Sequence, residues 1–135
     1  MRLEGWEQRL TELVDWARSR EYVLGEHDCF RFACEVIKAL TGEDRWPEFS
    51  GYRTRREAMA KLAQYGSNFE DAGDWFFRRP RVEKQWAQRG DVVAFMTVDG
   101  EKHLGICLGA DCCGLTDKGL TFFPTVQATC AWRVG

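Results

Sequence analysis

The chain has 135 residues, of which 44% are hydrophobic and 30% are charged, and its formal net charge is -2. A chain of this length can bury a core without metal or disulfide support, so we expect one domain over residues 1–135. The near-neutral charge argues against a nucleic-acid-binding protein, which normally carries a basic excess. No apolar stretch approaches the roughly 20 residues of a membrane span, so none is expected.

Helical periodicity and capping residues indicate four helices in the first half of the chain. Apolar residues recur at three- and four-residue spacing in the first two. Thr54 and Glu57, and then Ser67 and Glu70, have the spacing of a capping box, which predicts the starts of the third and fourth. A loop containing Trp46 is expected between the second and the third. The predicted helices cover residues 6–18, 29–40, 54–63 and 67–77.

The second predicted helix begins with a cysteine. Asp28 is a good N-cap residue, which makes Cys29 the first helical residue and places it on the apolar face with Phe32 and Val36. A helix N-terminus favours an anion, so we expect a larger thiolate fraction, and hence a stronger nucleophile, than in free cysteine. The alternative is that Cys29 is a buried small side chain without chemistry, as many free cysteines are.

The second half of the chain has the pattern of antiparallel strands. DVVAFMTV and KHLGICLG are apolar runs joined by Asp99-Gly100, a strong hairpin signal, and LTFFPTV is the last run. Turns are also expected at residues 109–111 and 117–119. Helices followed by a meander predict an α+β fold with the helices packed on one side of an antiparallel sheet.

The N-terminal segment MRLEGWEQRL lacks the apolar centre of a signal peptide, so we expect synthesis in the cytoplasm without one. The cysteines are accordingly expected to be free thiols rather than a disulfide framework. No C-x-x-C pair occurs, which argues against a structural zinc site. For Cys112 and Cys113 the sequence assigns no role beyond filling space. The six cysteines are Cys29, Cys34, Cys107, Cys112, Cys113 and Cys130.

A cysteine nucleophile requires a base within hydrogen-bond reach and a third group that orients the base. The chain has two histidines, and His103, on a predicted strand, is the better base, whereas His27 lies in the turn before the helix. Counting pairs outward from the turn at 109–110 places His103 opposite Thr116. Asp117, or Thr116 as the alternative, is therefore the predicted orienting residue, although both residue types also favour turns.

These residues also carry a resemblance to a known family. YVLGEHDCFRF, followed by RGDVVAF and then by HLGICLG, resembles the NlpC-type cysteine peptidases, papain-like endopeptidases of bacterial cell walls. The resemblance covers roughly residues 20–125. The segment TGEDRWPEFSGYRT and the ending GLTFFPTVQATCAWRVG are similar to a narrower subgroup that tailed phages and prophages encode among their tail genes.

The resemblance implies a papain-like fold in which Cys29 is the nucleophile and His103 the general base. It implies that Tyr22 contacts the substrate and the oxyanion region, and that no metal or organic cofactor is needed. The expected substrate is a peptidoglycan stem peptide, and the expected partners are phage tail-tip proteins in a virion tail. The chain departs from the family at Phe30-Arg31, where Ser-Gly is usual, and at Leu24, where Trp is usual.

Two other functions fit the same sequence. A non-catalytic tail-tip or tail-assembly protein could retain the peptidase fold for docking, and the many Trp and Phe side chains would suit an interface. A cytoplasmic amidase or transferase could use the same Cys–His pair on a small molecule.

Overall fold

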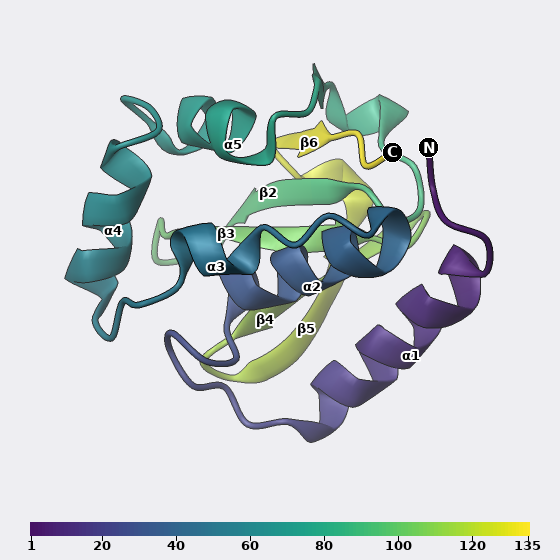
Figure 1. Ribbon diagram of the computed structural model, residues 1–135, viewed down its shortest axis with the longest axis horizontal. Helices are drawn as coiled ribbons and strands as arrows, with labels where there is room; N and C mark the ends of the chain where they lie inside the picture. The colour runs from purple at the N-terminus through teal and green to yellow at the C-terminus, as the bar shows by residue number, and fades with distance from the viewer.

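The computed structural model describes all 135 residues and contains five α-helices and one six-stranded antiparallel sheet. The strand order is β1-β6-β2-β3-β4-β5. In the view of Figure 1, α2 and α3 lie in front of the sheet, with α1 to the right, α4 to the left and α5 at the top. None of the helices is long and apolar enough to cross a membrane. The helices are α1 (Trp6–Ser19), α2 (Cys29–Thr41), α3 (Trp46–Phe49), α4 (Arg55–Ala63) and α5 (Phe69–Phe77); the strands are β1 (Arg81–Val82), β2 (Val92–Met96), β3 (Lys102–Cys107), β4 (Asp111–Thr116), β5 (Gly119–Pro124) and β6 (Cys130–Trp132).

The predicted α+β class is confirmed, and so is the meander, which forms strands β2 to β5. Two short strands escaped prediction: β1 and β6 pair with each other, and β6 also pairs with β2. Strands of two and three residues are too short for a periodic pattern to reveal them. Two 3₁₀ turns, at Lys84–Trp86 and Thr125–Gln127, were not predicted either.

The helix predictions hold for α1, α2 and α4, with two corrections elsewhere. Thr54 and Glu57 form the full capping box at the start of α4. At α5, however, the N-cap is Asn68 and not Ser67, because the Asn68 side chain accepts the bond from the Asp71 N–H. The predicted loop around Trp46 contains the short helix α3, in which a proline occupies the first turn, where its missing N–H costs nothing.

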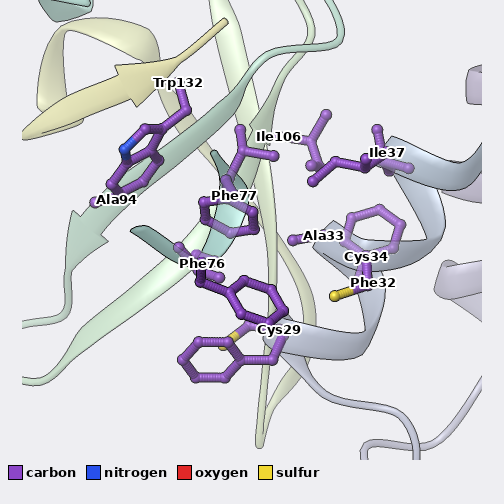
Figure 2. Packing of buried hydrophobic residues seen from close by; sticks show 14 of the residues in the cluster. Cys29, Phe32, Ala33, Cys34, Ile37, Phe76, Phe77, Ala94, Ile106 and Trp132 are labelled. Atoms are coloured by element: carbon purple, nitrogen blue, oxygen red, sulfur yellow. The ribbon is translucent and has the colours of Figure 1, made fainter. Parts of the chain in front are cut away.

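One large core lies between the sheet and the helices. Figure 2 shows Phe32, Ala33 and Ile37 of α2 facing the buried side chains of the sheet, among them Ile106 of β3. A smaller apolar cluster lies on the other face of the sheet. It contains Val93, Cys107, Cys112, Ala128 and Ala131.

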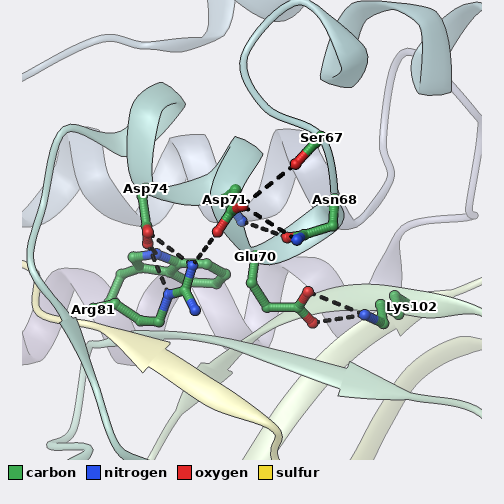
Figure 3. A network of polar contacts seen from close by, with 8 residues as sticks. Ser67, Asn68, Glu70, Asp71, Asp74, Arg81 and Lys102 are labelled. Atoms are coloured by element: carbon green, nitrogen blue, oxygen red, sulfur yellow. Dashed lines mark hydrogen bonds and ion pairs between the residues drawn. The ribbon is translucent and has the colours of Figure 1, made fainter.

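Helix α5 is held to the sheet by charged side chains (Figure 3). Arg81 donates to Asp71 and to both carboxylate oxygens of Asp74, at 2.8 to 3.0 Å. Glu70, in the first turn of α5, accepts two bonds from the Lys102 ammonium at 2.8 and 3.0 Å. The second contact ties α5 to the start of β3, one residue before His103.

Both ends of the chain are fastened to one buried carboxylate. Asp91, just before β2, is fully buried and forms ion pairs with Arg2 and Arg133, each at 3.2 Å. It also accepts bonds from the Val134 N–H at 3.0 Å and the Gln88 N–H at 2.9 Å. The Gly-Asp dipeptide at this strand start is therefore a structural junction.

Removing the Asp91 carboxylate leaves two guanidinium groups and two N–H groups without their partner. We expect Asp91→Ala to lower the free energy of unfolding by about 3–5 kcal/mol, as for other broken buried ion pairs. Urea denaturation followed by circular dichroism measures the change. Asp111→Ala, at an exposed position with no side-chain hydrogen bond, is the matched control and should stay within about 0.5 kcal/mol of the wild type. Equal loss in the two variants would contradict the junction role.

Candidate functional site

Cys29 is the first residue of α2, as predicted, and only 7% of its surface is exposed. The Asp28 side chain accepts the Arg31 N–H at 2.9 Å, whereas the Cys29 N–H has no hydrogen-bond partner in the protein. The sulfur lies beside the main chain of Leu104 in β3. The helix start thus places a thiol and a free N–H next to the strand that carries His103.

Asp28 is the hub of this region. Besides the Arg31 N–H, its carboxylate accepts the Gly25 N–H at 2.8 Å and the Tyr52 hydroxyl, and the side chain is almost fully buried. Gly25 has a φ of 83°, and a Cβ at this position would collide with the Tyr52 carbonyl oxygen. The turn before α2 therefore requires glycine, both for its backbone angle and for the close approach of the chain around Tyr52.

The expected activation of Cys29 by the helix N-terminus is not what the structure gives. The pKa of the Cys29 thiol is raised to about 12, first by burial and then by the negative charge of Asp28. The main chains of Leu104 and Phe30 and the guanidinium of Arg55 act in the opposite direction but do not outweigh burial. In the arrangement described, Cys29 is a neutral thiol at pH 7.

His103 lies on β3 opposite Phe95 of β2, and the two rings stack with their centroids 5.5 Å apart. Because alternate residues of a strand point to opposite faces, His103 shares the face of Cys107, whereas Leu104 and Ile106 face the helices. Burial lowers the pKa of the imidazole first, and Arg55 lowers it further, so the ring is a neutral base at pH 7.

Cys29 lies beside the first half of β3, the strand that carries His103. The β3–β4 pairing covers only Ile106 with Cys113 and Cys107 with Cys112, so the start of β3 has no β4 partner. The Cys29 sulfur lies beside the main chain of Leu104, the residue that follows His103. No hydrogen bond joins the Cys29 thiol to the His103 imidazole. His103 shares the sheet face of Cys107, whereas Leu104, beside the thiol, faces the helices, so the structure does not bring the two side chains together as a pair.

Arg55, at the start of α4, is the residue that the sequence argument missed. Its charge lowers the pKa of Cys29, of Tyr22 and of His103, so its guanidinium lies within electrostatic reach of all three. Arg55 also forms an ion pair with Glu101 at 3.1 Å. The sequence offered no signal for this, since an arginine in the first turn of an amphipathic helix is ordinary.

Tyr22 joins the same group of residues. Burial raises its hydroxyl pKa to about 12, and the neighbouring Cys29 and Asp28 groups act in the same direction, so the hydroxyl stays protonated and remains a hydrogen-bond donor. Tyr52, which the sequence did not single out, also has a raised hydroxyl pKa, and burial is the largest cause. Two phenol groups therefore flank the thiol.

The two candidates for the orienting residue differ in what they contact. The Thr116 hydroxyl donates to the Gly119 carbonyl and accepts the Lys118 N–H, so it serves the β4–β5 turn. The Asp117 charge acts on both Tyr22 and His103, which places this carboxylate near the site. The closest acidic contact of His103 is a third residue: its Nε2 lies 3.8 Å from a Glu101 carboxylate oxygen.

His27 lies away from these groups. It is almost fully buried, and its ring packs edge-on against Trp16 of α1 with the centroids 4.9 Å apart. Neither ring nitrogen has a hydrogen-bond partner of good geometry, and burial lowers its pKa. His27 is thus a neutral packing residue that joins α1 to the start of α2.

The molecule has surface pockets of about 410 and 380 Å³, and neither is lined by Cys29 or His103. The first lies between α1 and α2, and the second lies beside β1 and the turn at 84–86. No group of three or more His, Cys, Asp or Glu side chains is placed to hold a metal ion.

An α+β domain with a cysteine at a helix start and a histidine on the adjoining strand is the class that fold and site define. The chain belongs to the family described as a domain of unknown function, DUF6950, whose model matches residues 1–134. A search of the curated proteins found no match.

The Tyr52 hydroxyl is the side-chain donor that stabilises the buried Asp28 charge. We expect Tyr52→Phe to lower the free energy of unfolding by about 1.5–3 kcal/mol, the range for a hydrogen bond to a charged group. Chemical denaturation measures this. Tyr65→Phe is the matched control, because the Tyr65 hydroxyl makes no hydrogen bond and its ring packs on Phe76, and it should change stability by less than about 0.5 kcal/mol. If Tyr52→Phe leaves the free energy of unfolding unchanged, the bond from Tyr52 to Asp28 does not stabilise this region.

Proposed function

We propose that this protein is a phage tail-associated cysteine peptidase or amidase that cleaves amide bonds in bacterial peptidoglycan, with Cys29 as nucleophile and His103 as general base. The observation that carries the proposal is the contact between the N-terminus of α2 and β3. It places the Cys29 sulfur beside the main chain of Leu104, the residue after His103. The peptidoglycan substrate and the phage tail come from the resemblance to NlpC-type peptidases.

The chemistry proceeds in two transfers. His103 takes the proton of the Cys29 thiol as the sulfur attacks the amide carbonyl, and the imidazolium then returns a proton to the leaving amine as the C–N bond breaks. Water, deprotonated by His103, attacks the thioester and releases a carboxylic acid and the thiol. Because the Cys29 thiol has a pKa of about 12 and His103 is neutral, deprotonation accompanies attack instead of preceding it.

The free Cys29 N–H and the Tyr22 hydroxyl are the proposed donors to the oxyanion. The N–H is unpaired at the positive end of the α2 dipole, where negative charge is favoured. Tyr22 keeps its proton because its pKa is raised. A preorganised donor of this kind contributes about 3 kcal/mol to transition-state stabilisation. The proposed rate enhancement therefore depends on the helix start as much as on the thiol.

A second candidate function is a non-catalytic tail-tip or tail-assembly protein that keeps this fold for docking. The burial and raised pKa of Cys29 favour it, because an enclosed neutral thiol is the usual state of a packing cysteine. Among the exposed large apolar side chains, Trp75, Trp86 and Val126 are 66–72% exposed and would suit an interface.

Digestion of purified peptidoglycan sacculi tests the proposed reaction. We expect the wild type to release new amino groups, and both Cys29→Ala and His103→Gln to reduce that rate at least about 1000-fold, as removal of a nucleophile or its base does in comparable enzymes. Mass spectrometry of the released muropeptides identifies the bond.

Cys34→Ala is the matched control, since Cys34 lies on the same helix, one turn further on, and is buried in the core. It should keep most of the activity. Digestion that survives Cys29→Ala would overturn the mechanism. A wild type without activity that is nevertheless found in purified virions would favour the docking function.

The Arg55 charge should matter for the reactivity of Cys29. Removing it in Arg55→Gln raises the thiol pKa, so alkylation of Cys29 by iodoacetamide should slow by a few-fold and its pH–rate profile should shift to higher pH. Arg55→Lys keeps a positive charge and should retain most of the rate. Peptide mass spectrometry after timed quenching follows Cys29 alone. An unchanged profile in Arg55→Gln would show that this guanidinium does not act on the thiol.

A further inference from the structure

Two cysteines outside the candidate site face each other across neighbouring strands. Cys107 of β3 and Cys112 of β4 are direct partners in the antiparallel register, and both are fully buried in the small cluster behind the sheet. Cys113, the next residue, points to the opposite face and packs in the main core. The strand alternation therefore selects Cys112, and not its neighbour, as the partner of Cys107.

The hydrogen-bond pattern defines the spacing of this pair. Both main-chain groups of Cys107 bond toward β2: its N–H donates to the Asp91 carbonyl at 2.9 Å, and its carbonyl accepts the Gly90 N–H at 2.8 Å. Cys107 and Cys112 are thus a non-hydrogen-bonded pair, in which Cα atoms lie about 4.5 Å apart and side chains approach most closely. That spacing falls within the range of about 4.4–6.8 Å that a disulfide spans.

Polar contacts surround the two sulfur atoms. Cys107 accepts the Gly109 N–H at 3.4 Å, and the Cys112 thiol lies 3.4 Å from the Thr125 hydroxyl. A hydrogen bond with Cys112 lowers the pKa of Cys107 to about 6 and raises that of Cys112. Within the pair, Cys107 is therefore the more acidic thiol and Cys112 the less acidic one.

We propose that Cys107 and Cys112 are a redox site that forms a reversible disulfide between β3 and β4 when a small organic disulfide is the oxidant. The Cys107 thiolate attacks the oxidant, forms a mixed disulfide and expels one thiolate. Cys112 then loses its proton and attacks the Cys107 sulfur, which expels the second thiolate. The two cysteines lose two electrons in total, and the oxidant gains them as two thiols.

The site is independent of the proposed hydrolase. The pair lies at the end of β3 near the 108–110 turn, whereas His103 lies near the other end of the strand. A disulfide here would close the β3–β4 hairpin beside its turn and fix the register of the strand that carries His103.

Oxidation of the folded full-length protein tests this site. After incubation with bis(2-hydroxyethyl) disulfide, the remaining thiols are alkylated under denaturing conditions and counted by intact mass. We expect two fewer alkylated thiols and a mass lower by the two hydrogens lost. Proteolysis on the N-terminal side of Asp111 separates Cys107 from Cys112, so the disulfide appears as two linked peptides that dithiothreitol releases.

Three variants assign the bond. Cys113→Ser should form the same disulfide at the wild-type rate, whereas Cys107→Ser and Cys112→Ser should form none. A linkage through Cys29, Cys34, Cys113 or Cys130 would overturn the proposal. So would a folded protein that keeps six free thiols while the chain unfolded in urea is oxidised under the same conditions.

Discussion

A buried carboxylate with three hydrogen-bond donors and no ion-pair partner organises the region around Cys29. Asp28 fixes the start of α2, the turn at Gly25 and the chain around Tyr52 through these bonds. The same charge raises the pKa of Cys29 and of the two tyrosines beside it. Asp28 therefore has two opposing effects on Cys29: it fixes the position of the thiol at the helix start, and its charge helps to keep the thiol protonated.

This opposition bears on how a thiol in such a place can react. The N–H groups of the helix start and the Arg55 guanidinium favour an anion, but burial and the Asp28 charge outweigh them at Cys29. In the proposed hydrolase, negative charge builds up on the substrate oxygen beside the Cys29 N–H rather than resting on sulfur. In the proposed mechanism the unpaired Cys29 N–H donates to that oxyanion, so a helix start that disfavours a resting thiolate is compatible with the reaction.

The sequence predicted those parts of the fold that depend on local chemistry. The Asp28 cap, the Thr54–Glu57 capping box and the Asp99–Gly100 turn each act within a few residues, and each appears as expected. The register guess for the β3–β4 hairpin was right for the paired residues. It did not foresee that pairing ends at Ile106, which leaves His103 without a β4 neighbour and Thr116 in its turn. The roles of Arg55 and Tyr52 depend on contacts between distant segments, which no short pattern encodes. The pairing of Cys107 with Cys112, in contrast, follows from the predicted register of the hairpin.

The two chain ends meet at the C-terminal end of α2. Arg2 donates to the Val134 carbonyl at 2.8 Å, the Leu3 N–H donates to the Leu40 carbonyl at 2.7 Å, and Figure 1 shows the termini side by side. Cys29 occupies the opposite end of this 13-residue helix, about 20 Å away at 1.5 Å per residue. A protein fused to either terminus would therefore be attached at the same place on the surface. In both cases the fusion would lie at the opposite end of α2 from Cys29.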